Sequence, residues 1–201
     1  MTSLAITRPR SDLGVGLWVF IGVATTLFTL FVAAYVMRMS GSDWSTIALP
    51  WQLALSTALL MAGSVALQLG ARHAARSRWA AARTGVLVAG ACAAAFIASQ
   101  LWAWQVLQAA QVRMAGNPAA SFFYLLTAMH GLHVIGGLVA WSLTARRLDP
   151  PRDAPRAVEA MRLCARYWHF LLAVWLLLLA TLTGITPAVV AFVCGSPGVA
   201  P

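Results

Sequence analysis

The sequence predicts an all-α membrane protein, a single bundle of five transmembrane helices. Of its 201 residues 61% are hydrophobic and only 9% are charged, and the mean hydropathy is +0.78. A soluble domain carries roughly 25% charged residues. The apolar residues form five long runs without the alternation of strands, and lipid does not tolerate open sheet edges. Together these observations indicate a polytopic helical bundle.

Each run is long enough to cross a hydrocarbon core of roughly 30 Å, which takes about 20 helical residues. The expected spans are 14–37, 47–71, 84–108, 120–145 and 167–192. Pro50 falls early in the second span. Asn117 and Pro118 form a cap and a first-turn proline before the fourth. Pro187 is expected to kink or end the fifth. Residues 1–201 then form one transmembrane domain.

Arginine placement predicts the orientation. All 14 basic residues are arginines, and twelve fall at the N-terminus, in the second-to-third loop or in the fourth-to-fifth loop. The other two are Arg38 and Arg113. The positive-inside rule therefore predicts a cytoplasmic N-terminus and a periplasmic C-terminus. The arginines lie between hydrophobic runs, so we expect no nucleic-acid partner, because such a partner requires a basic face on a soluble fold.

Tryptophans and small residues suggest how the helices pack. The tryptophans near span ends are expected to form an interfacial belt: Trp44, Trp51, Trp79, Trp141 and Trp168. The deeper ones are expected to pack against neighbouring helices or a partner: Trp18, Trp102, Trp104 and Trp175. Gly22-xxx-Thr26 and Gly136-xxx-Ala140 have the small-residue spacing that allows helices in lipid to approach closely.

The spans contain no Asp, Glu, Lys or Arg. A charged group at mid-bilayer costs at least about 2.5–3.5 kcal/mol and is usually kept for function. A chain without one is poorly suited to move protons or ions itself, which disfavours a transporter. The titratable candidates near hydrocarbon are His130, His133 and His169.

His130 and His133, three residues apart, share one face of the fourth helix. A metal site needs further ligands, and no acid or thiol stands within helical reach. His169 is the possible partner from the fifth helix, but it lies roughly 3–6 Å from the cytoplasmic edge and His133 roughly 18 Å from it, at 1.5 Å per residue. The alternatives are a redox metal and neutral imidazoles that set helix register through hydrogen bonds to backbone carbonyls, Thr127 or a neighbouring helix. The depths favour the second.

Several segments resemble one family. "FFYLLTAMHGLHVIGGLVA" (Phe122–Ala140) resembles the helix of haem–copper oxidase subunit III that carries a His-Gly-x-His pattern. "RYWHFLLAVWLLLLATL" (Arg166–Leu182) resembles the last helix of that family. "WVFIGVATTLFTLFVAAYV" (Trp18–Val36) is similar to its first common helix and "SQLWAWQVL" (Ser99–Leu107) to its middle one. The resemblance implies the short, five-helix bacterial form of the cytochrome c oxidase subunit III fold.

The resemblance also implies a function. Members have no catalytic centre and bind no cofactor or metal. They lie beside subunit I, with subunit II in the same complex, and haem and copper belong to these partner subunits. They bind membrane phospholipid and sustain proton uptake by subunit I. The expected location is the bacterial inner membrane, and the electron donor could be cytochrome c or quinol. The expected structural residues, which would join the fourth and fifth helices, are His130, Gly131, His133, Trp168 and His169.

The chain departs from the family pattern at three positions. Carboxylates are expected where Ala24, Ala103 and Leu172 stand, and all three residues are apolar. Scaffold and lipid-binding roles do not need these acids. Two alternatives stay open: a subunit III-like accessory protein of a nitric oxide reductase, and, from another class, a stand-alone haem-b membrane oxidoreductase.

Overall fold

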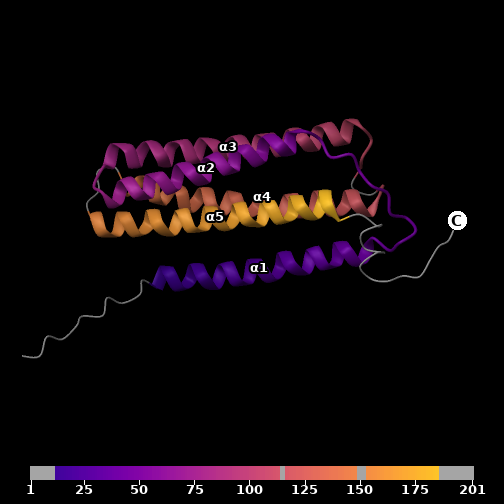
Figure 1. The fold of residues 1–201 in the computed structure, drawn as a ribbon, viewed down its shortest axis with the longest axis horizontal. Helices are drawn as coiled ribbons and strands as arrows, with labels where there is room; N and C mark the ends of the chain where they lie inside the picture. The colour runs from indigo at the N-terminus through magenta and orange to yellow at the C-terminus, as the bar shows by residue number, and fades with distance from the viewer. Residues whose placement is uncertain (1–11, 114–115, 149–152, 186–201) are drawn as a thin grey trace, which may run out of the picture.

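The computed structural model describes residues 12–113, 116–148 and 153–185, and in this part the chain is helical and has no strand. Five helices are each long and apolar enough to cross a membrane (Figure 1). They are α1 (Asp12–Arg38), α2 (Gln52–Ala75), α3 (Trp79–Ala109), α4 (Pro118–Arg146) and α5 (Ala154–Gly184). The predicted fold class is therefore confirmed.

The start of α2 differs from the expected span. The helix begins at Gln52, five residues after the predicted start at 47. A proline disfavours helical backbone in the residue before it, and Leu49 precedes Pro50. The carbonyl of Pro50 accepts the Leu53 N–H at 3.1 Å, which opens the first turn. Pro50 therefore precedes the helix and is not part of it.

The fifth helix begins before its predicted span. It begins at Ala154, where the Asp153 side chain accepts the Arg156 N–H at 3.2 Å. Pro155 occupies the first turn, which tolerates a missing N–H. The apolar pattern alone could not reveal this polar beginning. The helix ends at Gly184, and Pro187 and residues 186–192 lie outside the described residues.

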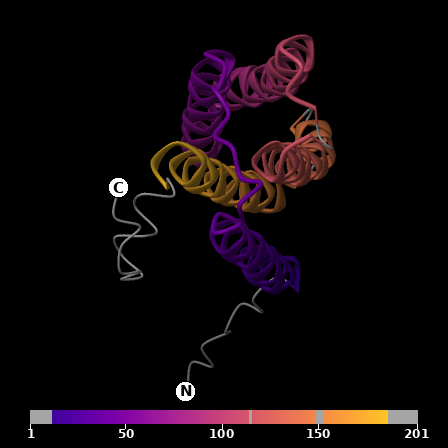
Figure 2. The same ribbon diagram turned by 90° about the vertical axis from the view of Figure 1, so that its right-hand side faces the viewer.

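Helices α2 to α5 form a four-helix bundle, and α1 lies outside it along α5 and α4 (Figure 2). The closest pair is α2 and α3. A Cβ added to Gly85 of α3 would lie 2.7 Å from the Ala66 carbonyl oxygen and 2.9 Å from the Gly70 Cα. The small-residue motifs expected at Gly22 and Gly136 do not form such contacts, because an added Cβ there meets nothing within 4 Å.

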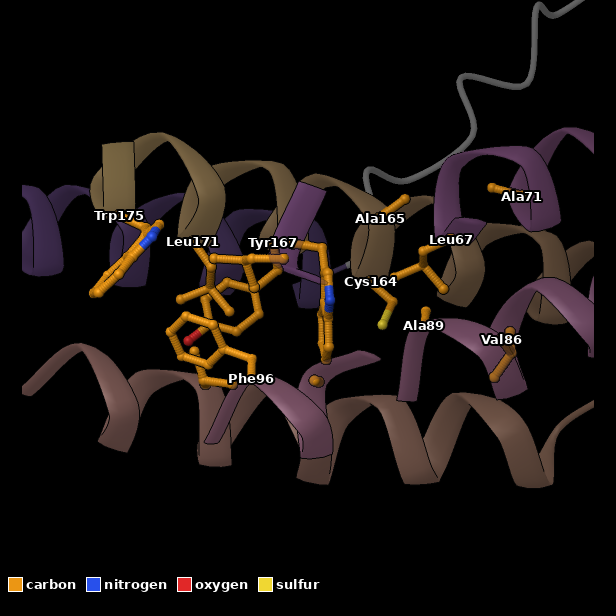
Figure 3. Packing of buried hydrophobic residues seen from close by; sticks show 14 of the residues in the cluster. Leu67, Ala71, Val86, Ala89, Phe96, Cys164, Ala165, Tyr167, Leu171 and Trp175 are labelled. Carbon is orange, nitrogen blue, oxygen red and sulfur yellow. The ribbon is translucent and has the colours of Figure 1, made fainter. Parts of the chain in front are cut away.

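Large aromatic side chains fill the centre of the bundle. Trp168 and Trp175 of α5 are completely buried, as is Phe96 of α3. The rings of Phe96 and Trp175 meet edge to face at 5.3 Å, and Leu171 and Tyr167 lie beside them (Figure 3). Dispersion contacts of this kind drive helix association in lipid, where apolar burial alone gives no advantage.

The tryptophans divide differently from the expected pattern. Trp168 is buried, and Trp141 donates its indole N–H to the Val86 carbonyl at 2.6 Å, so both serve helix packing. Trp18, expected to pack against neighbouring helices or a partner, is 59% exposed in the single chain, so its contact with a partner stays a prediction.

Figure 1 shows the start of α1, the α2–α3 connection, the end of α4 and the start of α5 at one end of the molecule. Most of the described arginines belong to this end. The orientation across the membrane stays a prediction. Arg8, Arg10 and the tail Gly195–Pro201, on which it partly depends, lie outside the described residues.

Candidate site around the paired histidines

His130 is enclosed by aromatic rings from three other helices. Its side chain is completely buried. The ring centroids lie 5.2 Å from Trp175 of α5, 5.6 Å from Phe96 of α3 and 6.4 Å from Phe28 of α1. Neither ring nitrogen has a hydrogen-bond partner among the described residues. His130 therefore occupies the position of a packed aromatic ring at the junction of four helices.

His133 turns toward α1. Its Nδ1 donates to the Met129 carbonyl at 2.7 Å, which fixes the proton on that nitrogen because a carbonyl can only accept. Its ring lies 5.2 Å from Phe28 and 5.9 Å from Phe20. The His133 carbonyl also accepts the Tyr167 hydroxyl at 3.0 Å, which joins α4 to α5.

Trp168 packs against two glycines, one on α4 and one on α2. A Cβ added to Gly137 of α4 would lie 3.1 Å from the Trp168 ring, and one added to Gly63 of α2 would lie 3.7 Å from its Nε1. The indole nitrogen has no hydrogen-bond partner among the described residues. Trp168 is thus held by shape between α2 and α4, and glycine at position 137 leaves the space for its ring.

His169 and Gly131 lie away from this packing. His169 Nδ1 is 2.6 Å from the Ser64 hydroxyl, and its Nε2 is 3.1 Å from Gln68 Oε1. Both partners belong to α2, although the sequence suggested α4. Gly131 lines a hollow of about 200 Å³ between α3 and α4, and an added Cβ there would meet nothing within 4 Å.

The histidines do not converge on one point. Their rings are directed to the bundle centre, to α1 and to α2. Among residues 12–113, 116–148 and 153–185, no three His, Cys, Asp or Glu side chains gather as metal ligands would. The arrangement can connect helices, and it offers neither the ligand set of a metal ion nor the opposed pair of a bis-histidine haem.

Two of the three positions where the family pattern expects acids are buried, and the third packs against the hydrophobic core. Ala24 is buried between α1 and the bundle, and Ala103 is completely buried in α3. Leu172 is half-buried and packs against the main core. These environments suit the residues present, since an unpaired carboxylate would carry a large desolvation cost there.

A buried polar group between α2 and α3 was missed by the sequence reasoning. Gln100 Nε2 donates to the Ser56 hydroxyl at 2.7 Å, and the Ser99 hydroxyl donates to the Gln52 carbonyl at 3.2 Å. The signal was present, since each of the two runs contains a glutamine together with a serine. Such bonds help fix the register of α2 against α3.

The α1–α2 connection is fastened to the start of α4. The Asn117 side chain caps α4 by accepting the Ala119 N–H at 3.0 Å, as the Asn117-Pro118 pair predicted. The Asn117 Nδ2 also donates to the Ser45 carbonyl of the connection. In the same connection, the hydrogen bond from Arg38 holds the pKa of Asp43 below its usual range. These contacts define the arginine-poor end of the molecule.

Comparison with known proteins agrees with this architecture. The family described as cytochrome c oxidase subunit III matches residues 7–183. The "Probable cytochrome c oxidase subunit 3" of Nocardia farcinica is 28% identical over 183 residues, covering 89% of this chain and 90% of that protein. The "Cytochrome c oxidase subunit 3" of Corynebacterium diphtheriae is 26% identical over 186 residues, with the same coverage of 89% and 90%. The chain therefore belongs to the cytochrome c oxidase subunit III family.

Proposed function

We propose that the chain is the non-catalytic subunit III of a haem–copper respiratory terminal oxidase in the bacterial inner membrane. The family match over residues 7–183 carries this proposal. In the complex the chain lies beside subunit I, with subunit II in the same assembly. Haem and copper belong to these partners, and this chain supplies no catalytic group of its own.

The proposed contribution is assembly, lipid binding and sustained proton uptake by subunit I. The packing of His130 and Trp168 supports a scaffold role, because both side chains are buried where several helices meet. Ala24, Ala103 and Leu172 leave no carboxylate at the three positions where the family pattern expects one. The chain would therefore sustain proton uptake through its contacts and its lipids, without an acid of its own at these sites.

The names of the relatives favour an oxidase over a nitric oxide reductase as the parent complex. Relatives from Nocardia, Mycobacterium and Corynebacterium match over nearly their whole lengths, and each is named as a cytochrome c oxidase subunit 3. By the same names, cytochrome c is the proposed electron donor.

Purification of the native complex tests the proposal. An affinity-tagged chain is expected to co-purify from its own membranes with a haem–copper subunit I and with subunit II. Enrichment of a nitric oxide reductase subunit in their place would favour the accessory-protein alternative. A haem Soret band from the isolated chain, free of partners, would contradict the assignment and favour a stand-alone haem-b oxidoreductase.

A further inference from the structure

A hollow of about 370 Å³ lies between α2 and α5 at the arginine-rich end of the molecule. Arg72 of α2 lines it, together with Arg162 and Arg166 of α5. Positions four apart on a helix share a face, so the two α5 arginines project to the same side. Gln68 and His169 complete its polar wall, and no acidic residue lines it in the described part of the chain.

The polar side chains that line the hollow present hydrogen-bond donors to it, because their acceptor atoms are already used. Gln68 Oε1 can only accept, so His169 Nε2 carries the proton that joins them, and His169 Nδ1 accepts the Ser64 hydroxyl. With Oε1 facing His169, the Gln68 N–H₂ group is turned away from the ring, and it has no acceptor among the described residues. Guanidinium groups also only donate. The wall is therefore complementary to an anion.

The positive charges of the hollow are not neutralised within the described residues. Neither Arg72 nor Arg162 forms an ion pair there. Glu159 lies one turn before Arg162 on α5 but does not line the hollow. The Arg166 guanidinium lies 5.5 Å from the centre of the Trp18 ring of α1, which positions the cation and leaves its charge intact. Clustered cations repel one another, and a phosphate, which arginine binds in bidentate fashion, relieves this repulsion.

The exposed surface that continues from the hollow toward the middle of the bundle is apolar. On α2, Val65 and Met61 lie one and two turns from Gln68 and are 57% and 49% exposed. On α5, Leu176 lies two turns beyond His169 and is 43% exposed. A free phosphate would leave this surface unused, whereas a phospholipid would cover it with its acyl chains. Basic pockets between transmembrane helices are known to attract anionic headgroups on the cytoplasmic side.

We propose that the hollow binds the phosphate of an anionic phospholipid, whose acyl chains lie along α2 and α5. The inference rests on the lipid-binding part of the proposed function and gives it a site and a headgroup class. Arg72, Arg162 and Arg166 bind the phosphate, and Gln68, oriented by His169, donates a further hydrogen bond.

Lipid titration of the purified protein tests the site. The full chain, with whatever subunits it retains, is titrated in neutral detergent with phosphatidylglycerol, phosphatidylcholine or inorganic phosphate, and the thermal midpoint and retained lipids are measured. Phosphatidylglycerol alone is expected to raise the midpoint. The Arg72→Gln/Arg162→Gln variant should bind it roughly tenfold more weakly or worse, because each basic residue near a headgroup contributes to the attraction.

Arg76→Gln/Arg147→Gln is the matched control, with the same change of charge at the same end but outside the hollow. It should bind phosphatidylglycerol within twofold of the parent. Equal losses in the two variants would overturn the site, and so would an equal response to inorganic phosphate, which would mean a free-anion site. The unmodified protein provides a test of its own: if phosphatidylglycerol and phosphatidylcholine raised its thermal midpoint equally, the proposal would be overturned. The partner subunits that co-purify are identified in the same samples, which separates a failure of the lipid site from a failure of the oxidase assignment. If no oxidase subunit is present but the preference for phosphatidylglycerol is retained, only the oxidase assignment is contradicted.

Discussion

Single side chains connect the helices of this protein through specific, short-range contacts. His130, His133 and His169 come from a pattern that suggests a shared site, yet each contacts a different set of helices. Spacing along one helix determines which residues share its face, and it contains no information on how that helix is rotated against its neighbours. The sequence could thus predict that these histidines lie near the hydrocarbon region, but not that His130 would be buried while His169 is exposed and bonds to α2.

Replacing His133 by alanine is expected to loosen α1 from the bundle. The ring contacts Phe20 and Phe28 of α1, and aromatic pairs contribute about 0.5–1.5 kcal/mol each. We expect a lower midpoint of thermal aggregation in detergent and unchanged metal content of the purified complex. Leu132→Ala is the control, because Leu132 is 60% exposed on the same helix. Metal loss from an otherwise intact complex would contradict the packing role.

Two tyrosine hydroxyls provide a second test at this scale. Tyr167 donates to the His133 carbonyl inside α4, which a helical N–H can also satisfy, whereas Tyr124 donates at 3.0 Å to the Val112 carbonyl beyond the end of α3. Tyr167→Phe should therefore cost about 0.6 kcal/mol. Tyr124→Phe should cost about 1–2 kcal/mol, since it removes the donor from a carbonyl outside the helix. Chemical denaturation of the two variants in one detergent would reveal the order, and the reverse order would refute this explanation.

At the scale of helices, glycine determines how closely α2 and α3 approach. Gly85→Ala would place its Cβ 2.7 Å from a backbone oxygen of α2, and backbone cannot move aside as a flexible side chain can. We expect a loss of about 1–3 kcal/mol, the range for overpacking. Thermal aggregation in detergent and the yield of folded protein would measure the loss.

Gly136→Ala is the matched control for this prediction. It is also a mid-helix glycine, but an added Cβ meets nothing within 4 Å. Alanine has the higher helix propensity, so this variant should be as stable as the parent or slightly more stable. Equal destabilisation by the two substitutions would mean that the α2–α3 approach is not the cause.

The helices themselves were largely predictable, and their contacts were not. Long apolar runs specify five helices, and Asn117 with Pro118 marks the start of α4 correctly. The fifth helix begins thirteen residues before its predicted span because an Asp153 cap adds polar turns to an apolar segment. The small-residue spacing pointed to Gly136, whereas it is the next residue, Gly137, that packs against the Trp168 ring. A difference of one residue turns a position by about 100° around a helix, beyond what small-residue spacing can resolve.

For the whole molecule, the unequal distribution of arginines predicts the topology. Nine of the described arginines belong to the end that carries the α2–α3 connection, and Arg38 and Arg113 belong to the other end. Loops rich in arginine are retained on the cytoplasmic side during insertion. The proposed lipid site belongs to the arginine-rich end, so the topology also determines which leaflet supplies its lipid.

Cysteine labelling tests this topology. With the native cysteines replaced by alanine, single cysteines are placed at Ser77, between α2 and α3, and at Ser40, after α1; both positions are exposed. A membrane-impermeant maleimide should label Ser40→Cys in intact spheroplasts and Ser77→Cys only in inverted vesicles. Labelling both cysteines after detergent permeabilisation controls for reactivity. The opposite pattern would contradict the cytoplasmic N-terminus and place the arginine hollow in the outer leaflet, where the negative surface potential of the cytoplasmic leaflet could not attract a headgroup to it.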